Sequence, residues 1–274
     1  MNKMLGPIVA FALVLPGCLG SDLGYIPEGP GDDDDDVPAG PDAGDEPVGG
    51  ARVQLGLQSL YTFDEGVGSI VADRSNVGAP LDLTIANPLA VEWMPDGGIN
   101  VVAPTVLQTV GPAAKIGYAC MANNAVTIEA WVRPAAVNQA GPARVLTFAE
   151  GANNANFMLG QENTLSTVRL RTTDTDGSGE PALNSDINVF TTQIVHVAYT
   201  RSGLDDEAQT WLNGQLVATE TLAGNFGNWD VTYPLSIANE PNGERPWRGE
   251  IYLAAVYCRD LSPLEVWQNY EAGY

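Results

Sequence analysis

Short alternating or uniformly apolar runs, separated by turn residues, recur along the chain from Leu57 onward. An apolar residue at every second position is typical of a strand with one buried face, and a short apolar run fits a strand buried on both faces. The pattern predicts strands over Leu57–Phe63, Leu81–Ile85, Val126–Pro134, Arg144–Glu150, Asn156–Gly160, Ser166–Thr172, Gln193–Arg201, Gln209–Leu212, Gln215–Thr221, Leu235–Asn239 and Glu250–Cys258. About eleven short strands and few helices predict an all-β fold, either a sandwich of two antiparallel sheets or a barrel.

Turn and capping residues locate one hairpin and two helices. Asn213-Gly214 separates two strand-like runs, and because both residues tolerate a positive φ angle they predict a two-residue hairpin turn. Ser262-Pro263-Leu264-Glu265 has the residues of a capping box with proline at the first helical position, which predicts a short C-terminal helix. A weaker helical pattern covers Pro112–Ala122.

Alternation inside two of the strands predicts a ligand-binding surface. Glu129 and Trp131 point away from the apolar face of one strand, and Arg169 and Arg171 point away from the apolar face of another. If both strands share a sheet, an indole ring lies near a carboxylate and two guanidinium groups, which suits a sugar. The alternative is a tryptophan packed between the sheets beside a cross-strand Glu–Arg pair that contributes under ~1 kcal/mol.

The chain is strongly acidic, with 12 Lys and Arg against 34 Asp and Glu and a formal net charge of −22. Proteins that bind duplex nucleic acid need clustered basic side chains to release counterions, so we expect no nucleic-acid partner. Ten of the acidic residues lie between Cys18 and Gly50. The residues after Gly50 still carry 24 acidic against 11 basic side chains, a net charge of −13.

The first 17 residues have the pattern of an export signal. Lys3 supplies a positive charge, and the apolar run Ile8–Leu15 is far shorter than the ~20 residues that span a bilayer. The run ends in Leu15-Pro16-Gly17-Cys18, which resembles the lipobox of bacterial lipoproteins. The resemblance implies that residues 1–17 are a signal peptide and that Cys18 is lipidated. Leu19 follows the cysteine where a signal for retention in the inner membrane would have Asp, so the resemblance also implies sorting to the outer membrane or cell surface of a Gram-negative bacterium. The alternative to a lipoprotein is ordinary secretion.

Residues 18–50 form a second compositional block, rich in Pro, Gly and Asp, with five consecutive aspartates at Asp32–Asp36. Like charges repel and the block has little apolar surface to bury, so it predicts a disordered, extended tether. A calcium site is the alternative, but adjacent aspartates do not supply ligands that converge around a turn. We therefore assign the folded domain to residues 51–274.

Several motifs of this domain occur in the order found in one family of β-sandwich domains. They are Leu60-Tyr61-Thr62-Phe63-Asp64-Glu65-Gly66-Val67-Gly68 with Val71-Ala72-Asp73, Val126-Thr127-Ile128-Glu129-Ala130-Trp131-Val132, His196-Val197-Ala198-Tyr199, Trp211-Leu212-Asn213-Gly214, Trp247-Arg248-Gly249-Glu250-Ile251, and Val256-Tyr257-Cys258-Arg259-Asp260-Leu261-Ser262. Together they resemble the laminin-G-like, concanavalin A-like jelly-roll domains of bacterial surface proteins. The resemblance implies two packed antiparallel sheets and a module that binds glycans or proteins.

Two pairs of acidic residues are candidate calcium ligands. Asp174 and Asp176 lie in a run of alternating carboxylates and glycines, which fits either a calcium-binding loop or an ordinary polar turn. Asp64 and Asp73 belong to the opening motif, which lies near metal sites in some members of the family that the chain resembles. Members of that family often carry Asp after the Ile of the Gly-x-Ile strand, but Tyr252 stands here. Calcium is the one cofactor that the sequence leaves open.

Motifs of hydrolytic enzymes are missing from the sequence. Glucanases of the same fold place acids on one strand as Glu-x-Asp-x-x-Glu, with two carboxylates about 5 Å apart, and this chain has no Glu-x-Asp. It also lacks a Gly-x-Ser-x-Gly elbow, a phosphate loop and a histidine pair for zinc. His196, the only histidine, lies in a strand-like run and fits a packed or hydrogen-bonded residue better than a catalytic base. We expect no enzymatic activity.

Lipidation of Cys18 would leave two thiols, Cys120 and Cys258, in an exported compartment that permits oxidation. Either they form a disulfide that joins the Pro112–Ala122 helix to the last strand, or they are two separate buried thiols.

These observations predict a non-catalytic, surface-displayed module that binds a carbohydrate or cell-surface polymer and meets the membrane only through its lipid anchor. The alternative is a structural or adhesive lipoprotein that binds an envelope protein, and a glycan-active enzyme is a remote third. Nothing in the sequence indicates the oligomeric state.

Overall fold

The computed structural model describes residues 50–185 and 187–274. The predicted signal peptide, Cys18 and the acidic tether up to residue 49 lie outside the described residues. The strands are β1 (Leu57–Tyr61), β2 (Ile70–Val71), β3 (Leu83–Ile85), β4 (Val91–Trp93), β5 (Ile99–Val101), β6 (Leu107–Thr109), β7 (Val126–Pro134), β8 (Ala143–Gly151), β9 (Asn154–Glu162), β10 (Leu165–Leu170), β11 (Leu183–Asn184), β12 (Val195–Arg201), β13 (Glu207–Leu212), β14 (Gln215–Thr221), β15 (Leu235–Ile237) and β16 (Gly249–Tyr257). The helices are α1 (Ala114–Asn123) and α2 (Pro263–Glu271), with a 3-10 turn at Pro88–Ala90.

Every strand that the sequence predicts is present, with ends displaced by a few residues. The sequence misses β2, β4, β5, β6 and β11, each of which has only two or three residues. Such short segments do not show a period-two pattern. Their pairing partners, which come from distant parts of the chain, define them as strands.

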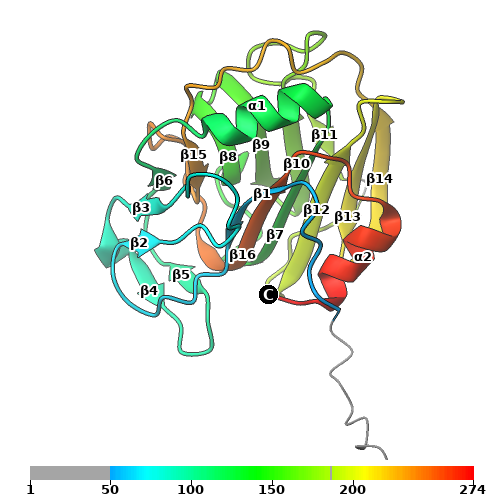
Figure 1. Ribbon diagram of the computed structural model, residues 1–274. Coiled ribbons are helices and arrows are strands. Elements are labelled where there is room, and N and C mark those ends of the chain that lie inside the picture. The colour runs from blue at the N-terminus through cyan, green and yellow to red at the C-terminus, as the bar shows by residue number, and fades with distance from the viewer. Residues whose placement is uncertain (1–49, 186) are drawn as a thin grey trace, which may run out of the picture. The chain divides into compact units, whose positions relative to one another are not determined.

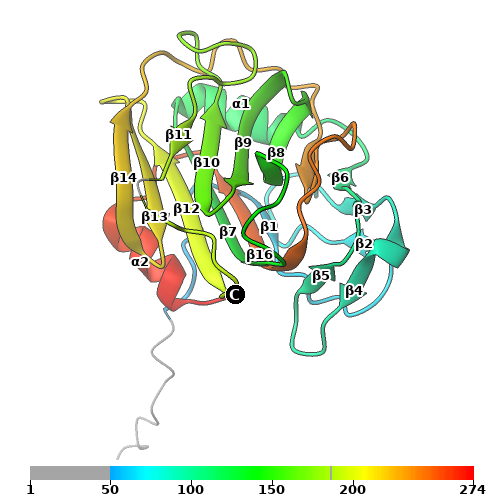
Figure 2. The ribbon, with the colours of Figure 1, turned by 180° about the vertical axis from the view of Figure 1, so that it is seen from behind.

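The strands form two antiparallel sheets. Sheet A has the order β14-β13-β12-β7-β16-β5-β4, with β1 also paired to β16, and sheet B has the order β11-β10-β9-β8-β15-β6-β3-β2. Figure 1 shows sheet A with α2 lying against it, and Figure 2, from behind, shows β8, β9 and β10 of sheet B in front. The predicted two-sheet jelly-roll sandwich is confirmed.

The main core lies between the two sheets. Val126, Ile128, Ala130 and Val132 of β7 point into it and are fully buried, as strand alternation predicts. A second apolar cluster lies on the opposite face of sheet A, where α2 and the segment before β1 cover the strands. Sheet A is therefore buried on both faces, and only sheet B has an outer face without a helix packed against it.

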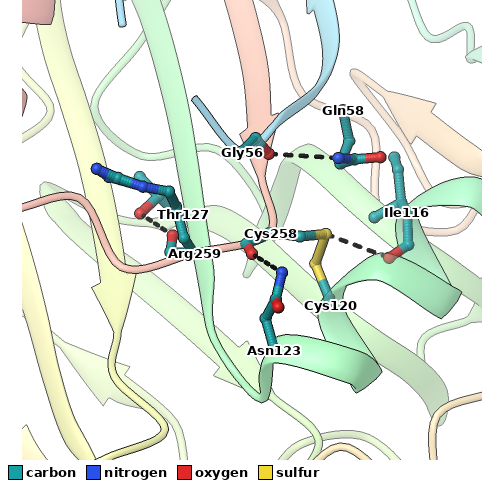
Figure 3. The surroundings of a disulfide bond; sticks show 8 residues. All are labelled: Gly56, Gln58, Ile116, Cys120, Asn123, Thr127, Cys258 and Arg259. Atoms are coloured by element: carbon teal, nitrogen blue, oxygen red, sulfur yellow. Dashed lines mark hydrogen bonds between the residues drawn. A yellow bond between two sulfur atoms is a disulfide. The ribbon is translucent and has the colours of Figure 1, made fainter. Parts of the chain in front are cut away.

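Both predicted helices are present, and a disulfide attaches α1 to the sandwich. Cys120 of α1 is bonded to Cys258, which directly follows β16, with their Cα atoms 4.4 Å apart (Figure 3). Asn123 adds a hydrogen bond of 2.8 Å from its side-chain amide to the carbonyl oxygen of Cys258. The disulfide, rather than two separate thiols, is the confirmed alternative.

The capping box and the hairpin are also confirmed. The Ser262 hydroxyl accepts a hydrogen bond from the backbone N–H of Glu265, whose carboxylate accepts one from the backbone N–H of Ser262. Asn213 and Gly214 have φ angles of 49° and 74°. A Cβ atom on Gly214 would lie 2.7 Å from the Trp267 ring of α2, so glycine also lets the hairpin approach this helix. None of the helices in the described part of the chain is long and apolar enough to cross a membrane.

Candidate functional site

The four residues predicted to form one ligand-binding surface lie on two different sheets. Glu129 and Trp131 belong to β7 of sheet A, whereas Arg169 belongs to β10 of sheet B and Arg171 directly follows it. The expected shared surface is therefore wrong, because the chain crosses to the other sheet between β7 and β8. Strand alternation places each side chain on a face of its own strand but does not assign the strand to a sheet.

Glu129 is a buried structural carboxylate. Arg52 donates a hydrogen bond to its Oε1, His196 Nε2 lies 2.9 Å from the same oxygen, and Asn269 of α2 donates to Oε2 at 2.9 Å. Burial alone would raise the pKa of Glu129, but the Arg52 charge and the contact with His196 lower it to about 2. His196 is fully buried in this contact, so it is a hydrogen-bonded strand residue, as expected.

Trp131 is covered by the C-terminal part of the chain. Its ring stacks on Tyr270 of α2 with centroids 5.6 Å apart and an interplanar angle of 6°, and Tyr274 packs at 5.3 Å. Only 9 % of the residue is exposed. In this conformation the indole fixes α2 against sheet A, and it does not offer a platform to a sugar.

Arg169 lies on the outer face of sheet B. Directly paired residues of neighbouring strands share a face. The pairings therefore define one outward row: Arg169, Met158, Thr147, Ser236 and Gln108. Arg171 continues the alternation, and its backbone N–H donates to the carbonyl oxygen of Asn156 at 2.8 Å.

Two further arginines and a glutamate join this outer face. Arg144 pairs with Gly160 across β8 and β9, and its guanidinium contacts the buried carboxylate of Glu240. Burial lowers the pKa of Arg144, and the nearby charges of Arg169 and Arg245 lower it further. We call the set of Arg144, Arg169, Arg171, Arg245, Glu240, Ser236 and Gln108 the arginine face.

Sequence reasoning found two of these arginines and missed the others. A bulge in β8 shifts the register between Arg144 and Leu146, so simple alternation would place Arg144 on the same face as buried Leu146. Arg245 and Glu240 lie in the loop after β15, which carries no periodic signal. Only the folded loop brings them to the sheet.

Several polar atoms of the arginine face are buried without a hydrogen-bond partner. Among the described residues they are Nε of Arg169, Arg171 and Arg245, Oε2 of Glu240, Oγ of Ser236 and Oε1 of Gln108. Buried polar groups are normally paired, and an unpaired group costs about 1–3 kcal/mol. Ordered water or a ligand can supply these partners. The side chain of Arg169 is 20 % exposed, whereas Arg144, Glu240 and Ser236 are fully buried, so solvent reaches only part of the face.

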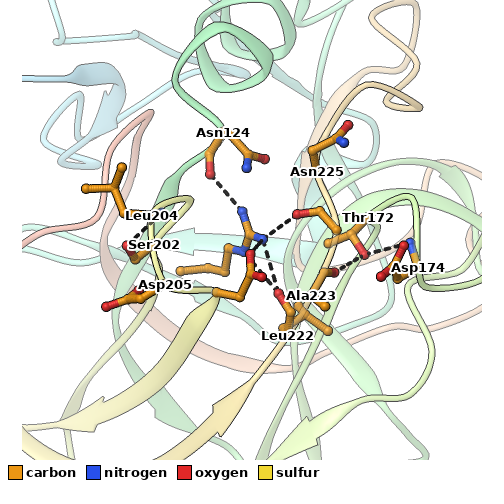
Figure 4. A network of polar contacts seen from close by, with 12 residues as sticks. Asn124, Thr172, Asp174, Ser202, Leu204, Asp205, Leu222, Ala223 and Asn225 are labelled. Atoms are coloured by element: carbon orange, nitrogen blue, oxygen red, sulfur yellow. Dashed lines mark hydrogen bonds and ion pairs between the residues drawn. The ribbon is translucent and has the colours of Figure 1, made fainter.

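Arg201 shows how an arginine with a purely structural role is bound. Its guanidinium donates to the carbonyl oxygens of Asn124 at 2.8 Å, Leu222 at 3.1 Å and Gly224 at 2.5 Å, and to Asp206 at 2.6 Å (Figure 4). Its Nε also donates to Leu222, at 3.4 Å. All three nitrogens of this buried guanidinium have partners, whereas the Nε atoms of Arg169, Arg171 and Arg245 have none among the described residues.

A pocket of about 470 Å³ lies between the β8–β9 turn and the loop that carries Glu240 and Arg245. Its lining includes Glu150, Asn154 and Asn242. It shares this loop with the arginine face and lies at the end of the central strands β8 and β9 of sheet B.

The candidate calcium ligands contact groups of the protein itself. Arg74 donates to Asp64 at 2.7 Å, and Lys115 donates to Asp73 at 2.7 Å. Burial would raise the pKa of Asp73, but the hydrogen bond from Lys115 and two backbone N–H groups lower it. These two aspartates are thus held in ion pairs with basic side chains.

Asp174 and Asp176 belong to the turn after β10. The Asp176 carboxylate accepts hydrogen bonds from the backbone N–H groups of Ser178 and Glu180 at 2.8 and 3.0 Å. The backbone N–H of Asp174 donates to Thr172 Oγ1 at 3.1 Å. Among residues 50–185 and 187–274, no three His, Cys, Asp or Glu side chains are grouped to hold a metal ion.

Sequence comparison identifies the family of this sandwich. The family model described as the concanavalin A-like lectin/glucanases superfamily, of laminin-G type, matches residues 108–267, from β6 to α2. The chain belongs to this superfamily. No curated protein matches the chain.

Solved structures with the same fold are distant in sequence. The binding domain of botulinum neurotoxin serotype D/C is 10% identical with a TM-score of 0.57, covering 79% of this chain and 52% of that one. Domain 4 of an extracellular GH43 arabinanase from Geobacillus stearothermophilus, in complex with arabinotriose, is 15% identical with a TM-score of 0.57, covering 78% of this chain and 98% of that one. The chain thus spans about half of the toxin binding domains and nearly all of the arabinanase domain.

Proposed function

We propose that the chain is a non-catalytic binding module that recognises carbohydrate on the arginine face of sheet B. The observation that carries this proposal is the set of buried polar atoms without partners on that face. Sugar hydroxyls both donate and accept hydrogen bonds, so an oligosaccharide satisfies arginine donors and carboxylate or amide acceptors together. Loops at the end of strands β8 and β9 add the pocket beside Glu150 and Asn242.

Two distant structural neighbours support a carbohydrate ligand. The arabinanase domain is bound to arabinotriose, and cell entry of botulinum neurotoxin type C depends on interaction with two ganglioside molecules. A shared fold alone does not determine a ligand, because one fold carries many functions. The polar composition of the arginine face is therefore the main argument, and the neighbours agree with it.

The arrangement of carboxylates favours binding without turnover. Glycoside hydrolysis needs two carboxylates facing one bond across an open site. Glu129 is covered by α2 and bound by Arg52, and Glu240 contacts Arg144. With no Glu-x-Asp in the sequence, neither carboxylate has the strand neighbour that a glucanase of this fold uses.

We further propose that Cys18 anchors the module to the outer membrane or cell surface through a lipid, and that the acidic block up to Gly50 acts as a spacer. The lipobox-like Leu15-Pro16-Gly17-Cys18 supports the anchor, and the run Asp32–Asp36 supports an extended spacer. Mass spectrometry of the protein purified from bacterial membranes should find an acylated N-terminal peptide beginning at Cys18. An unmodified N-terminus at another residue would contradict the anchor.

A glycan array tests the binding function. The full chain with Cys18→Ser, which removes the acylation site, is applied with and without calcium, and we expect it to bind a defined set of glycans. Arg169→Gln should weaken that binding about tenfold or more, because it removes a charged hydrogen-bond donor. Arg133→Gln is the matched control, since Arg133 also pairs with a glutamate but belongs to sheet A.

Binding that Arg133→Gln weakens as strongly as Arg169→Gln would contradict the arginine face as the site. Absence of binding to every glycan would contradict carbohydrate recognition. Direct binding to one purified envelope protein would then establish the adhesive alternative.

A further inference from the structure

The arginine face gathers guanidinium groups on a domain that is otherwise acidic. Four of the ten arginines of the chain lie on it, although residues after Gly50 carry a net charge of −13. The acids beside them are Glu240, Glu180 and Asp230; Asp230 has its pKa lowered by hydrogen bonds from Thr232 and by the Arg171 charge. The hydrogen bond from Ser178 and the Arg169 charge also lower the pKa of Asp176, so four guanidinium groups face four carboxylates.

One of these ion pairs can exchange with a ligand. Arg169 Nη2 lies 2.5 Å from Glu180 Oε1 in an ion pair, and the side chain of Glu180 is 41 % exposed on the loop between β10 and β11. Exposed ion pairs contribute little to stability, so a carboxylate on a ligand can replace Glu180 at small cost. Guanidinium groups bind carboxylates in a planar, two-pronged geometry that neutral sugars do not match.

The same face also requires hydrogen-bond donors from its ligand. Oε2 of Glu240 and Oε1 of Gln108 are acceptors without partners among the described residues. Inorganic sulfate and phosphate present mostly acceptor oxygens, so they complement the arginines but not these two atoms. A sugar that carries both hydroxyls and a carboxylate complements all of them.

The length of the outward row and the net charge of the domain further restrict the class of ligand. Arg169 and Gln108 are four strand spacings apart, which at about 4.8 Å each is ~19 Å. Because Met158, Thr147 and Ser236 between them are fully buried, a ligand that reaches both ends of the row must be longer than a single sugar. A densely charged polyanion would be repelled by the surrounding net charge of −13, whereas a mostly neutral chain with a single carboxylate would not.

We infer that the ligand is an oligosaccharide with a carboxylate-bearing sugar, whose carboxylate displaces Glu180 from Arg169 and is bound by Arg169 and Arg171, while neutral sugars extend toward Gln108. This inference rests on the proposed function, because it names the ligand class of the same site.

The test compares an acidic oligosaccharide selected from the array with the same oligosaccharide after reduction of its carboxyl group to an alcohol. Calorimetry with the full-length Cys18→Ser protein should show at least tenfold tighter binding of the acidic form, and the preference should decrease as salt is raised. Arg169→Gln and Arg171→Gln should abolish the preference, so that each variant binds the acidic and the reduced form with equal affinity. Glu180→Gln should bind the acidic form about three- to tenfold more tightly, because it removes the competing carboxylate.

Arg133→Gln and Glu250→Gln are the matched controls, since these residues form a similar pair on sheet A and should not change the preference. Thermal unfolding checks that each variant is folded. Equal affinity for the acidic and reduced forms would overturn the inference and leave the proposed function standing. Equally tight binding of a sulfated form of the same sugar would overturn the assignment to a carboxylate. No binding of either form would overturn both proposals.

Discussion

The carboxylate of Glu129 lies where three separated segments of the chain meet. It is bound by Arg52, which precedes β1, by His196 of β12 and by Asn269 of α2. The amide oxygen of Asn269 in turn accepts a hydrogen bond from the backbone N–H of Val53 at 2.9 Å. One buried acidic residue thus holds both ends of the folded domain against sheet A.

Replacement of Glu129 by Gln should lower the free energy of unfolding at pH 7 by about 3–5 kcal/mol, because the buried Arg52 loses its counter-charge. The folded-state pKa of about 2 lies below the ordinary value of 4.5. The stability from this ionisation is therefore fully present above about pH 4.5 and is lost as the pH falls toward 2. Urea unfolding at pH 7 and at about pH 2.5 should show that the difference in free energy of unfolding between wild type and Glu129→Gln is smaller at the lower pH.

Exposed Glu207→Gln is the control for this experiment and should change the free energy of unfolding by less than about 0.5 kcal/mol. A difference between wild type and Glu129→Gln that is the same at pH 7 and pH 2.5 would contradict the assigned ionisation.

Helix α1 depends on one covalent bond and on packing beneath it. Its N-cap residue, Ala113, makes no side-chain cap hydrogen bond, whereas α2 has a complete capping box. Ile116 and Cys120 of α1 are fully buried, and the disulfide joins residues 138 positions apart. The bond therefore restricts the unfolded chain over more than half of its length.

Cys120→Ser with Cys258→Ser should lower the free energy of unfolding by about 2–5 kcal/mol, because the unfolded chain regains the entropy of this long loop. The measurement is denaturant unfolding of wild type under oxidising and reducing conditions beside the double variant. Reduced wild type should unfold close to the variant. Equal stability of oxidised and reduced wild type would contradict a stabilising role for the disulfide.

At the scale of the whole molecule, an ion pair between Lys115 and Asp73 stabilises the region from β1 to β3. The ammonium group of Lys115 lies 2.7 Å from Asp73 Oδ2 and 2.7 Å from the carbonyl oxygen of Val77. Carboxylate and carbonyl oxygens are ligands that calcium prefers, and here the lysine ammonium group contacts them. The pair links α1 to the loop after β2, two segments far apart in the sequence.

We therefore expect the melting temperature of the full chain to be the same in EDTA and in millimolar calcium. Lys115→Met should destabilise the fold by about 3 kcal/mol, because the buried Asp73 carboxylate loses its counter-charge. Arg74→Met is the control, since its pair with Asp64 is half exposed and should contribute less than about 1 kcal/mol. A calcium-dependent rise in the melting temperature of wild type would contradict the prediction.

Residues close together in the sequence were sufficient to predict the helices, the longer strands and the buried face of individual strands. Side-chain alternation predicted the buried face of β7, two positive φ angles explain the turn at Asn213-Gly214, and the capping box located α2. These features depend on residues within a few positions of one another, so the sequence by itself determined them. The all-β fold class followed from their number and spacing.

Tertiary structure decided which of these elements share a surface. It placed β7 and β10 in different sheets, covered Trp131 with α2, turned Arg144 outward through a bulge and brought Glu240 to it from a loop. It also chose a disulfide over two thiols and gave Asp73 a lysine partner 42 residues away. All of these contacts join distant segments, and local periodicity carries no information about which distant segment will be the partner.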